Sequence, residues 1–195
     1  VFLSDFSPGM IFQARLNIGT ASGAFCYSVL DAQSVPYSAV CFDLVIANHM
    51  LYHIPNRSLA LNEIHRVLKP GGKLIAATNG NNHMGELQQL LLRLDTDLAY
   101  HTDRAFGVNE FTIENGTEQL SPWFDNICTL PFEGSLEVTD PEPLIAYILS
   151  MNTSPQKHVT RQQISSLLDN INSEIKRYGS YHITKSTALF FAEKL

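Results

Sequence analysis

Positive charge is scarce in this sequence. It has 13 Lys and Arg against 19 Asp and Glu, which gives a formal net charge of -6. Basic residues form no patch or arm, so we do not expect nucleic acid as a ligand, because phosphate binding needs clustered Lys and Arg. Long apolar runs are missing as well, and none approaches the ~20 residues that cross a membrane. We therefore expect neither a nucleic-acid-binding protein nor a membrane-spanning one.

Cysteine is also rare, with only Cys26, Cys41 and Cys128 in the chain. Their odd number and wide spacing, without any C-x-x-C, argue against a structural zinc site and favour a reducing compartment, the cytoplasm. His49 and His53 lie four residues apart, as metal-binding pairs do. The Glu of an H-E-x-x-H motif is absent between them, so we expect no metal ion.

Several motifs of other enzyme classes are absent. The sequence has no G-x-S-x-G of hydrolases and no cysteine in a recognisable nucleophile context. The stretch KPGGK at 69–73 lacks the spacing and the Ser or Thr of a phosphate-binding P-loop. Its Pro and Gly instead predict the end of a helix. No G-x-G-x-x-G occurs either, although Gly9, Gly19 and Gly23 are present.

What the sequence does contain is an alternation of buried strands and amphipathic helices, with 45% hydrophobic residues. We predict strands at 1–4, 25–31, 42–48 and 73–79, and a helix capped by Ser7 with Pro8 in its first turn. This alternation predicts an α/β fold with a mainly parallel sheet. The second half predicts helices at 83–98, 117–124, 140–151 and 160–179, and strands at 126–138 and 181–194.

Helical spacing also predicts which side of each helix is buried. In the helix predicted at 58–68, the expected buried residues are Leu59, Ile64, Val67 and Leu68. In the helix at 160–179, they are Ile164, Leu167, Leu168, Ile171 and Ile175.

Three polar residues, Asp5, Asp31 and Asn48, stand at the ends of predicted strands. Ligands of open parallel sheets bind outside the carboxyl ends of the strands, so these side chains are expected to converge on one crevice. A carboxylate at Asp5 can accept hydrogen bonds from two vicinal hydroxyls. Alone, each such residue is more often a turn residue or a helix cap, and it is their order and spacing that favours a ligand site.

The second of these strand ends suits an adenine base. Asp31, followed by Ala32 and Gln33, is placed to accept a hydrogen bond from an exocyclic amine. Phe6 and Val35 are candidates to cover the faces of the base. Together with a ribose at the first strand end, this pattern predicts an adenosine-containing ligand.

Four stretches, VFLSDFSPGM, YSVLDAQSVPY, FDLVIANHMLYHIPN and LNEIHRVLKPGGKLIAATN, together resemble class I S-adenosylmethionine-dependent methyltransferases. The final HITKSTALFFAEK is similar to the last, antiparallel strand of that family. The resemblance implies a Rossmann-like methyltransferase fold with a mainly parallel sheet. It implies one domain, residues 1–195, with a cofactor-side core at 1–79, acceptor-side helices and a strand at 80–181, and the final strand at 182–195.

The resemblance also implies roles for particular residues. Those that would bind S-adenosylmethionine are Asp5 for the ribose, Phe6 and Met10 beside the adenine, Asp31 and Ala32 for the adenine amine, and Asn48 and His49 for the methionine part. Leu51, Tyr52 and His53 correspond to the entrance of the acceptor pocket. Candidates for a general base are His53, Tyr52, His83 and His101.

One part of the family pattern is missing. The glycine-rich first motif and its strand, which lies between the strands predicted at 1–4 and 42–48, have no counterpart here. Without it, both neighbouring strands keep an unpaired edge. We therefore expect a segment upstream of the chain, or a second chain as in a homodimer, to cover the gap.

The expected function is transfer of a methyl group from S-adenosylmethionine to a small-molecule acceptor. One alternative is a truncated or degenerate methyltransferase fold that does not bind the cofactor, which the missing glycine loop favours. Another is a nicotinamide-dependent oxidoreductase, which shares the strand-end Asp. The DAQ and LKPGG stretches favour the methyl donor over the nicotinamide.

Overall fold

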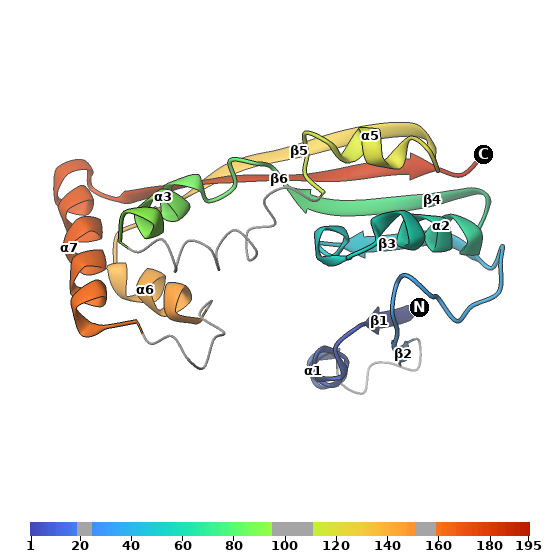
Figure 1. Ribbon diagram of the computed structural model, residues 1–195, viewed down its shortest axis with the longest axis horizontal. Coiled ribbons are helices and arrows are strands. Elements are labelled where there is room, and N and C mark those ends of the chain that lie inside the picture. Colours follow the sequence, from blue (N-terminus) through green and yellow to red (C-terminus); the bar gives the residue numbers. More distant parts are fainter. Residues whose placement is uncertain (19–24, 95–110, 151–158) are drawn as a thin grey trace. The chain divides into compact units, whose positions relative to one another are not determined.

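The computed structural model describes residues 1–18, 25–94, 111–150 and 159–195, and its strands form two sheets (Figure 1). In the first, β1 (Phe2–Asp5) pairs in parallel with β2 (Cys26–Val29). The second has the order β3-β4-β6-β5, and its strands are β3 (Phe42–Asn48), β4 (Leu68–Asn79), β6 (Tyr181–Glu193) and β5 (Asp125–Val138). Figure 1 shows β6 running opposite to β4, which confirms the predicted antiparallel C-terminal strand.

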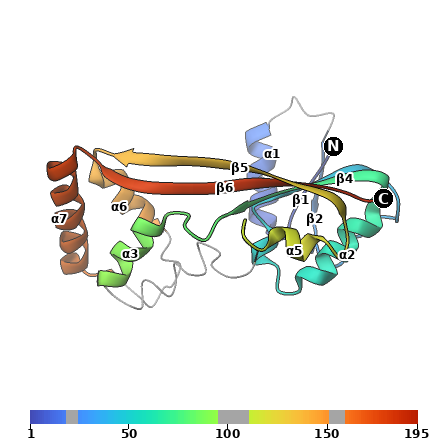
Figure 2. The same cartoon turned by 90° about the horizontal axis from the view of Figure 1, so that it is seen from above.

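Helices follow β1 and β3, and the second half combines further helices with the long strands β5 and β6, as Figure 2 also shows. They are α1 (Pro8–Ile18), the short 3₁₀ helix η1 (Leu51–His53), α2 (Arg57–Val67), α3 (Gly85–Leu94), α5 (Gly116–Leu120), α6 (Pro141–Ser150) and α7 (Arg161–Tyr178). The predicted helices are confirmed, and the predicted bounds at 95–98 and 151 lie outside the described residues.

The break between the two sheets lies where the sequence resemblance leaves out a strand. Within the described residues, no ladder joins β1 to β3, so each is the edge of its own sheet. The rings of Phe2 and Phe42, the first residues of these strands, are nevertheless in contact, with centroids 5.4 Å apart. Tyr37 contacts both rings, at 5.3 Å and 5.2 Å. The two edges therefore approach each other without pairing.

The chain divides into two compact units. The first comprises Val1–Ala76, Leu120–Cys128 and Phe191–Leu195, and the second comprises Ala77–Gln119 and Thr129–Phe190. The predicted site residues from Asp5 to His53 all belong to the first unit. The prediction of a single domain with three subdivisions stays a prediction.

Helix α2 supplies much of the core of the first unit. Ala60, Leu61, Ile64 and Val67 are at most 5% exposed, and Asn56 caps the helix by accepting a hydrogen bond from the Leu59 amide. The prediction that Leu59 is buried was wrong, because this side chain is 50% exposed. The buried stripe passes instead through Ala60 and Leu61, a choice between adjacent faces that helical spacing alone leaves open.

The strand predicted at 73–79 begins earlier, at Leu68, so KPGG lies inside β4. Non-local pairing explains the difference. The Gly71 amide donates to the Lys194 carbonyl at 2.6 Å, and the Lys194 amide donates to the Gly72 carbonyl at 2.9 Å. Gly71 has a φ of +74°, a conformation that glycine adopts without strain. These bonds keep the turn-like sequence in the sheet.

The second unit has a continuous apolar core. It is formed by ten buried residues: Met84, Leu87, Leu90, Leu91, Leu144, Ile145, Ile148, Leu167, Ile171 and Ile183. Helix α7 contributes Leu167 and Ile171, as predicted, and the other predicted apolar residues of this helix, Ile164, Leu168 and Ile175, pack partly buried against the cluster. Thr160 and Gln163 form a capping box at its start, and Gly179 ends it in the left-handed conformation.

Candidate functional site

Asp5 is the last residue of β1, and its exposed carboxylate takes part in a local turn. The Ser7 amide donates to Asp5 Oδ1 at 2.7 Å, while Ser7 Oγ accepts from the Met10 amide at 3.4 Å at the start of α1. Among the described residues, none donates a hydrogen bond to Asp5 Oδ2. The turn role and the ligand role are therefore compatible, since one carboxylate oxygen orients the side chain and the other is open.

Asp31 follows the neighbouring strand, so the two carboxylates are close along the sheet edge. The Leu30 amide donates to the Asp5 carbonyl at 3.1 Å, which extends the parallel ladder to the strand ends. The Asp31 carboxylate is half-buried and is held by Gln33. The Gln33 amide donates to Oδ1 at 2.8 Å, and Gln33 Nε2 lies 3.1 Å from both oxygens.

The end of β3 carries Asn48 and His49. Asn48 is exposed and His49 is half-buried, with a φ of +49° that places it in the left-handed region. For a residue other than glycine this conformation is uncommon and costs on the order of 1–3 kcal/mol, and it occurs often at functional sites. Burial lowers the pKa of His49, so its imidazole is neutral at pH 7. It is then able to accept a proton.

Next along the chain, η1 consists of the three residues predicted at the entrance of the acceptor pocket. Tyr52 and His53 have ring centroids 4.5 Å apart, and Tyr52 lies 6.3 Å from His49. Leu51, also predicted at the entrance of the acceptor pocket, is fully buried and anchors the helix instead. Burial raises the pKa of Tyr52, which keeps its hydroxyl protonated near neutral pH. Tyr52 is thus a hydrogen-bond donor in this cluster rather than a base.

The strands β1 and β3 point the same way in Figure 1, and their first residues are in ring contact. Their carboxyl ends, with Asp5 and Asn48, therefore lie on the same side of this unit. In a parallel sheet, polar groups at such strand ends are expected to converge on a ligand, and that convergence stays a prediction here. The individual roles of the residues stay predictions.

Helix α2 holds the loop after β2 through residues that the sequence interpretation did not single out. Glu63 accepts a hydrogen bond from the Val35 amide at 2.9 Å. Arg66 donates to the carbonyls of Val35 at 2.9 Å and Tyr37 at 2.8 Å, and it pairs with Glu63 at 2.7 Å. The hydrogen bond from Arg66 lowers the pKa of Glu63, and the bond to Glu63 raises the pKa of Arg66. The sequence pattern predicted the helix that carries Glu63 and Arg66, but not these contacts.

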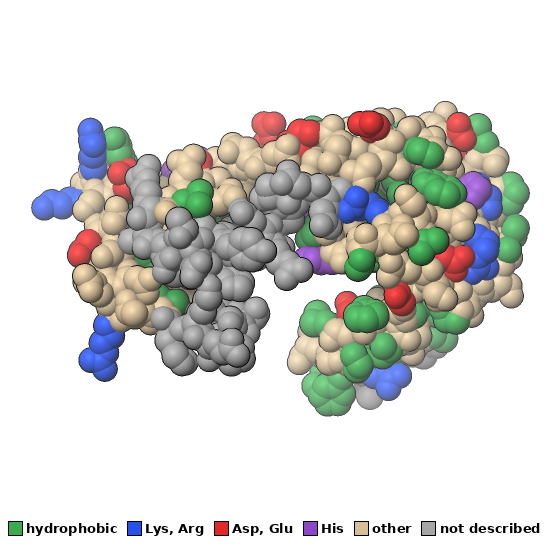
Figure 3. All heavy atoms as spheres, in the orientation of Figure 1, with side chains coloured by type: hydrophobic (Ala, Val, Ile, Leu, Met, Phe, Trp, Pro, Cys, Tyr) green, Lys and Arg blue, Asp and Glu red, His purple; other side chains and the backbone are tan. Residues whose placement is uncertain are grey.

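The two predicted base-lining residues from this part of the chain are exposed. Phe6 is 75% exposed and Met10 is 58% exposed, next to Phe12 and Leu16 at 63% and 59%. Figure 3 shows hydrophobic side chains gathered over α1. Exposed apolar residues in such a group are typical of a binding surface.

Of the two further base candidates, His83 and His101, the structure describes only His83. His83 belongs to the second unit, where its Nδ1 lies 3.1 Å from the Ser186 carbonyl and accepts from the Ser186 amide at 3.2 Å. Its ring is thus engaged with the backbone of β6. His101 lies outside the described residues. Among the described candidates, His53 is the one whose ring contacts Tyr52, and its role as a base stays a prediction.

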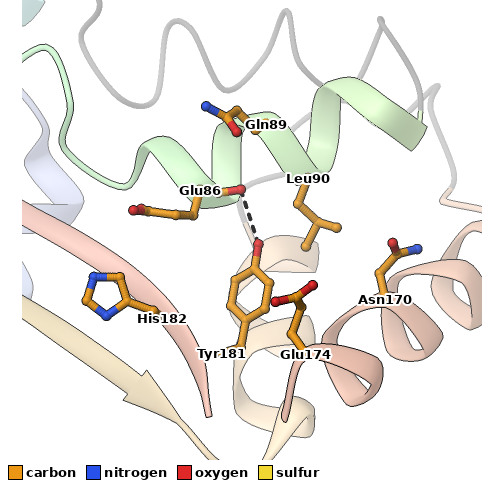
Figure 4. A pocket seen from close by; sticks show the side chains of 7 residues that line it. All are labelled: Glu86, Gln89, Leu90, Asn170, Glu174, Tyr181 and His182. Atoms are coloured by element: carbon orange, nitrogen blue, oxygen red, sulfur yellow. Dashed lines mark hydrogen bonds between the residues drawn. The ribbon is translucent and has the colours of Figure 1, made fainter. Parts of the chain in front are cut away.

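The second unit contains a polar pocket with a cavity volume of about 260 Å³ (Figure 4). It is lined by Glu86, Gln89, Leu90, Asn170, Glu174, Tyr181 and His182, and the Tyr181 hydroxyl donates to the Glu86 carbonyl at 3.2 Å. Burial acts to raise the pKa of Glu86, but hydrogen bonds from Thr184 outweigh it and leave that pKa lowered. This pocket contains none of the predicted site residues.

Comparison with known proteins agrees with this fold. A family model described as a methyltransferase domain matches residues 1–76. A malonyl-acyl-carrier-protein O-methyltransferase from Erwinia billingiae is 34% identical over 91 residues, which cover 47% of this chain and 35% of that protein. The match therefore spans about a third of the relative's length.

Two solved structures share the fold. One is a Bacillus halodurans protein solved as a candidate methyltransferase, with a TM-score of 0.66 and 18% identity, covering 100% of this chain and 82% of that one. The other is a Haemonchus contortus phosphoethanolamine N-methyltransferase in complex with S-adenosylhomocysteine, with a TM-score of 0.58, 18% identity, and coverage of 100% and 43%. The chain has a Rossmann-like methyltransferase fold, and its resemblance to class I S-adenosylmethionine-dependent methyltransferases is confirmed.

Proposed function

We propose that this protein transfers a methyl group from S-adenosylmethionine to a small-molecule acceptor. The observation that supports this most is the pair of carboxylates at adjacent strand ends, Asp5 and Asp31, in a chain that matches a methyltransferase domain. The names of the relatives give different acceptors, malonyl-acyl-carrier protein in one case and phosphoethanolamine in another. The comparisons give no support to the nicotinamide-dependent oxidoreductase.

The residues present fit the adenosine half of this cofactor. Asp5 Oδ2 is open to ribose hydroxyls, Asp31 offers an acceptor for the adenine amine, and Phe6 and Met10 expose apolar surface beside them. For the methionine half, this chain supplies Asn48 and His49 at the end of β3. The first unit thus supplies more groups for the base and ribose than for the amino acid.

The bound cofactor would supply an activated methyl group on its sulfonium sulfur. The chain would then have to orient the acceptor in line with that methyl, and such alignment contributes up to roughly 7–11 kcal/mol in favourable cases. His53 and the neutral His49 are placed to remove a proton from an oxygen or nitrogen acceptor, and Tyr52 to donate a hydrogen bond to it.

Calorimetry with S-adenosylhomocysteine and, separately, NAD tests the cofactor. We expect 1:1 binding of S-adenosylhomocysteine and no heat with NAD. Binding of NAD alone would support the oxidoreductase alternative. Binding of neither would support the degenerate fold and contradict the proposal.

Substitution of Asp5 tests the ribose contact. Asp5→Asn keeps a carbonyl oxygen for the Ser7 amide but removes the charge and the second acceptor, whereas Asp5→Ala removes both. We expect each variant to weaken S-adenosylhomocysteine binding by about 10–100-fold, the effect of losing hydrogen bonds to a charged group. Asp169→Ala, on the exposed side of α7, is the matched control. Unchanged affinity in Asp5→Asn would leave Asp5 as a turn residue only.

We further propose that a second copy of the chain covers the unpaired edges of β1 and β3. In a parallel ladder alternate residues face each neighbour, so the backbone groups of Phe2 and Ser4 point away from β2. On β3, Leu44 and Ile46 are 45% and 64% exposed, although edge strands usually carry charges. These edges fit an added β-strand with apolar side chains.

Sedimentation equilibrium tests this dimer. We expect a dimer for the unmodified chain and a monomer for Ile46→Lys, because a charge on the edge opposes strand addition. Leu92→Lys is the control, since Leu92 on α3 is 49% exposed and lies in the other unit. A monomer at micromolar concentration without any substitution would contradict the dimer.

The described helices include none long and apolar enough to cross a membrane. Cys26, Cys41 and Cys128 are all exposed and form no disulfide. Exposed free thiols are typical of a reducing environment, so we propose a cytoplasmic location. A disulfide found by mass spectrometry in protein isolated from its natural source would contradict this location.

A further inference from the structure

Three polar groups of Gln33 form hydrogen bonds, two with Asp31 and one with Asn56. Its backbone amide and its side-chain NH₂ both donate to the Asp31 carboxylate, at 2.8 Å and 3.1 Å. Its side-chain carbonyl accepts from the Asn56 amide at 3.0 Å. Because an amide N–H can only donate, this last bond fixes the orientation of the Gln33 side chain, with NH₂ toward Asp31.

These bonds hold the Asp31 carboxylate in one orientation and leave it few free acceptor positions. An ionised carboxylate has about four acceptor positions, and Gln33 occupies three of them. The remaining position accepts a hydrogen bond and cannot donate one. A base that presents an amine fits this position, whereas a base that presents a carbonyl would place oxygen against oxygen.

The same side chain reaches the other half of the site. Asn56 caps α2 and lies three residues after His53, the last residue of η1. The rest of the loop is held on the same helix by Glu63 and Arg66. Gln33 is thus the link between the carboxylate at the end of β2 and the segment with the proposed acceptor residues.

We propose that Gln33 is a positioning residue that aims the remaining acceptor position of Asp31 at the amine of a 6-amino purine and couples the binding of that base to the segment at Asn56. This inference rests on the proposed function, since it assigns the base site of the same cofactor. It adds a residue and a selectivity to that site.

Binding of two nucleosides tests the role of Gln33 separately from the proposed function. The probes are S-adenosylhomocysteine and S-inosylhomocysteine, in which a carbonyl replaces the 6-amine, and affinities are measured by calorimetry on the full chain. We expect the unmodified chain to prefer the amine. Gln33→Leu should reduce that preference by about tenfold, because a carboxylate that is no longer held in place aligns poorly with the amine and loses about the strength of one charge-assisted hydrogen bond. Gln162→Leu, an exposed glutamine of α7, is the control.

The outcomes distinguish failure of the function from failure of this inference. Binding of neither probe to the unmodified chain would overturn both. A preference for the amine that Gln33→Leu leaves unchanged would overturn the role of Gln33 while the proposed function stands. A merely structural role would weaken both probes equally, so their ratio is the informative quantity.

A measurement on the unmodified chain keeps the coupling testable even if Gln33→Leu does not fold. We expect S-adenosylhomocysteine to slow hydrogen exchange of the Asn56 amide, because the base fixes Asp31 and through it Gln33. S-Inosylhomocysteine is expected to slow it less. Equal exchange of the Asn56 amide with and without S-adenosylhomocysteine would overturn the coupling.

Discussion

Helices α1 and α7 both carry several large apolar residues, but they differ in how far these side chains are buried. α7 buries Leu167 and Ile171 in the core of its unit, and both of its ends are capped. α1 buries only Ile11 and exposes several large apolar side chains. The region of β1, α1 and β2 therefore has apolar surface to offer a partner or ligand, whereas α7 stabilises the fold.

The same contrast holds for the two sheets. β6 lies between two strands, while β1 and β3 end their sheets at the break. Unpaired backbone groups and exposed apolar residues occur together at that break, next to the strand ends that carry Asp5 and Asn48. The candidate site thus lies beside the strand edges that have no partner strand among the described residues.

Core substitutions test this contrast with the largest expected effect. Ile171→Ala in α7 should lower the free energy of unfolding by about 2–5 kcal/mol, because the side chain is fully buried and leaves a cavity. Leu16→Ala in α1 should cost within about 0.5 kcal/mol, since that side chain is 59% exposed. Urea denaturation measures both. Equal costs would mean that α1 is covered in solution.

Loss of the helix caps should have an intermediate effect. Thr160→Ala removes a capping box at the start of α7 and should cost about 1 kcal/mol. Ser7→Ala removes a single 3.4 Å bond to the Met10 amide and should cost less, about a few tenths of a kcal/mol. Thermal unfolding of the two variants gives the comparison. A larger loss for Ser7→Ala would contradict the weaker anchoring of α1.

The titration of His49 should give the smallest effect. Burial lowers its pKa in the folded state, so its contribution to stability is full above the unfolded pKa and is lost as pH falls through the folded pKa. Unfolding free energies measured from pH 7.5 down to pH 5 should therefore decrease. His49→Asn, whose side chain tolerates a positive φ, should reduce that decrease without straining the backbone. An unchanged pH dependence would mean that other groups cause it.

Local patterns in the sequence were sufficient for most elements of the fold. Ser7 before Pro8 predicted the start of α1, and the run of apolar residues at Phe42–Asn48 predicted β3. Leu59 was placed on the wrong side of α2 because its neighbour Leu61 fits a helical stripe equally well. The early start of β4 depends on Lys194, more than 100 residues away, and no local signal shows it.

The candidate site was predictable in its positions but not in its contacts. Asp5 and Asp31 stand at or just after the ends of strands that the apolar runs in the sequence predict. The bond between Gln33 and Asn56 joins residues 23 positions apart, and the support of Val35 by Arg66 spans 31 positions. Such contacts arise from the packing of the loop on α2, which the sequence pattern does not specify.

Chemical-shift mapping with S-adenosylhomocysteine tests most directly where the cofactor binds. We predict that the amide signals of residues at the ends of β1 and β2, above all Asp5 and Asp31, change on titration, and that the change saturates with a single affinity. Changes confined to the pocket lined by Glu86 and Glu174, or no changes at all, would contradict adenosine binding at the strand ends.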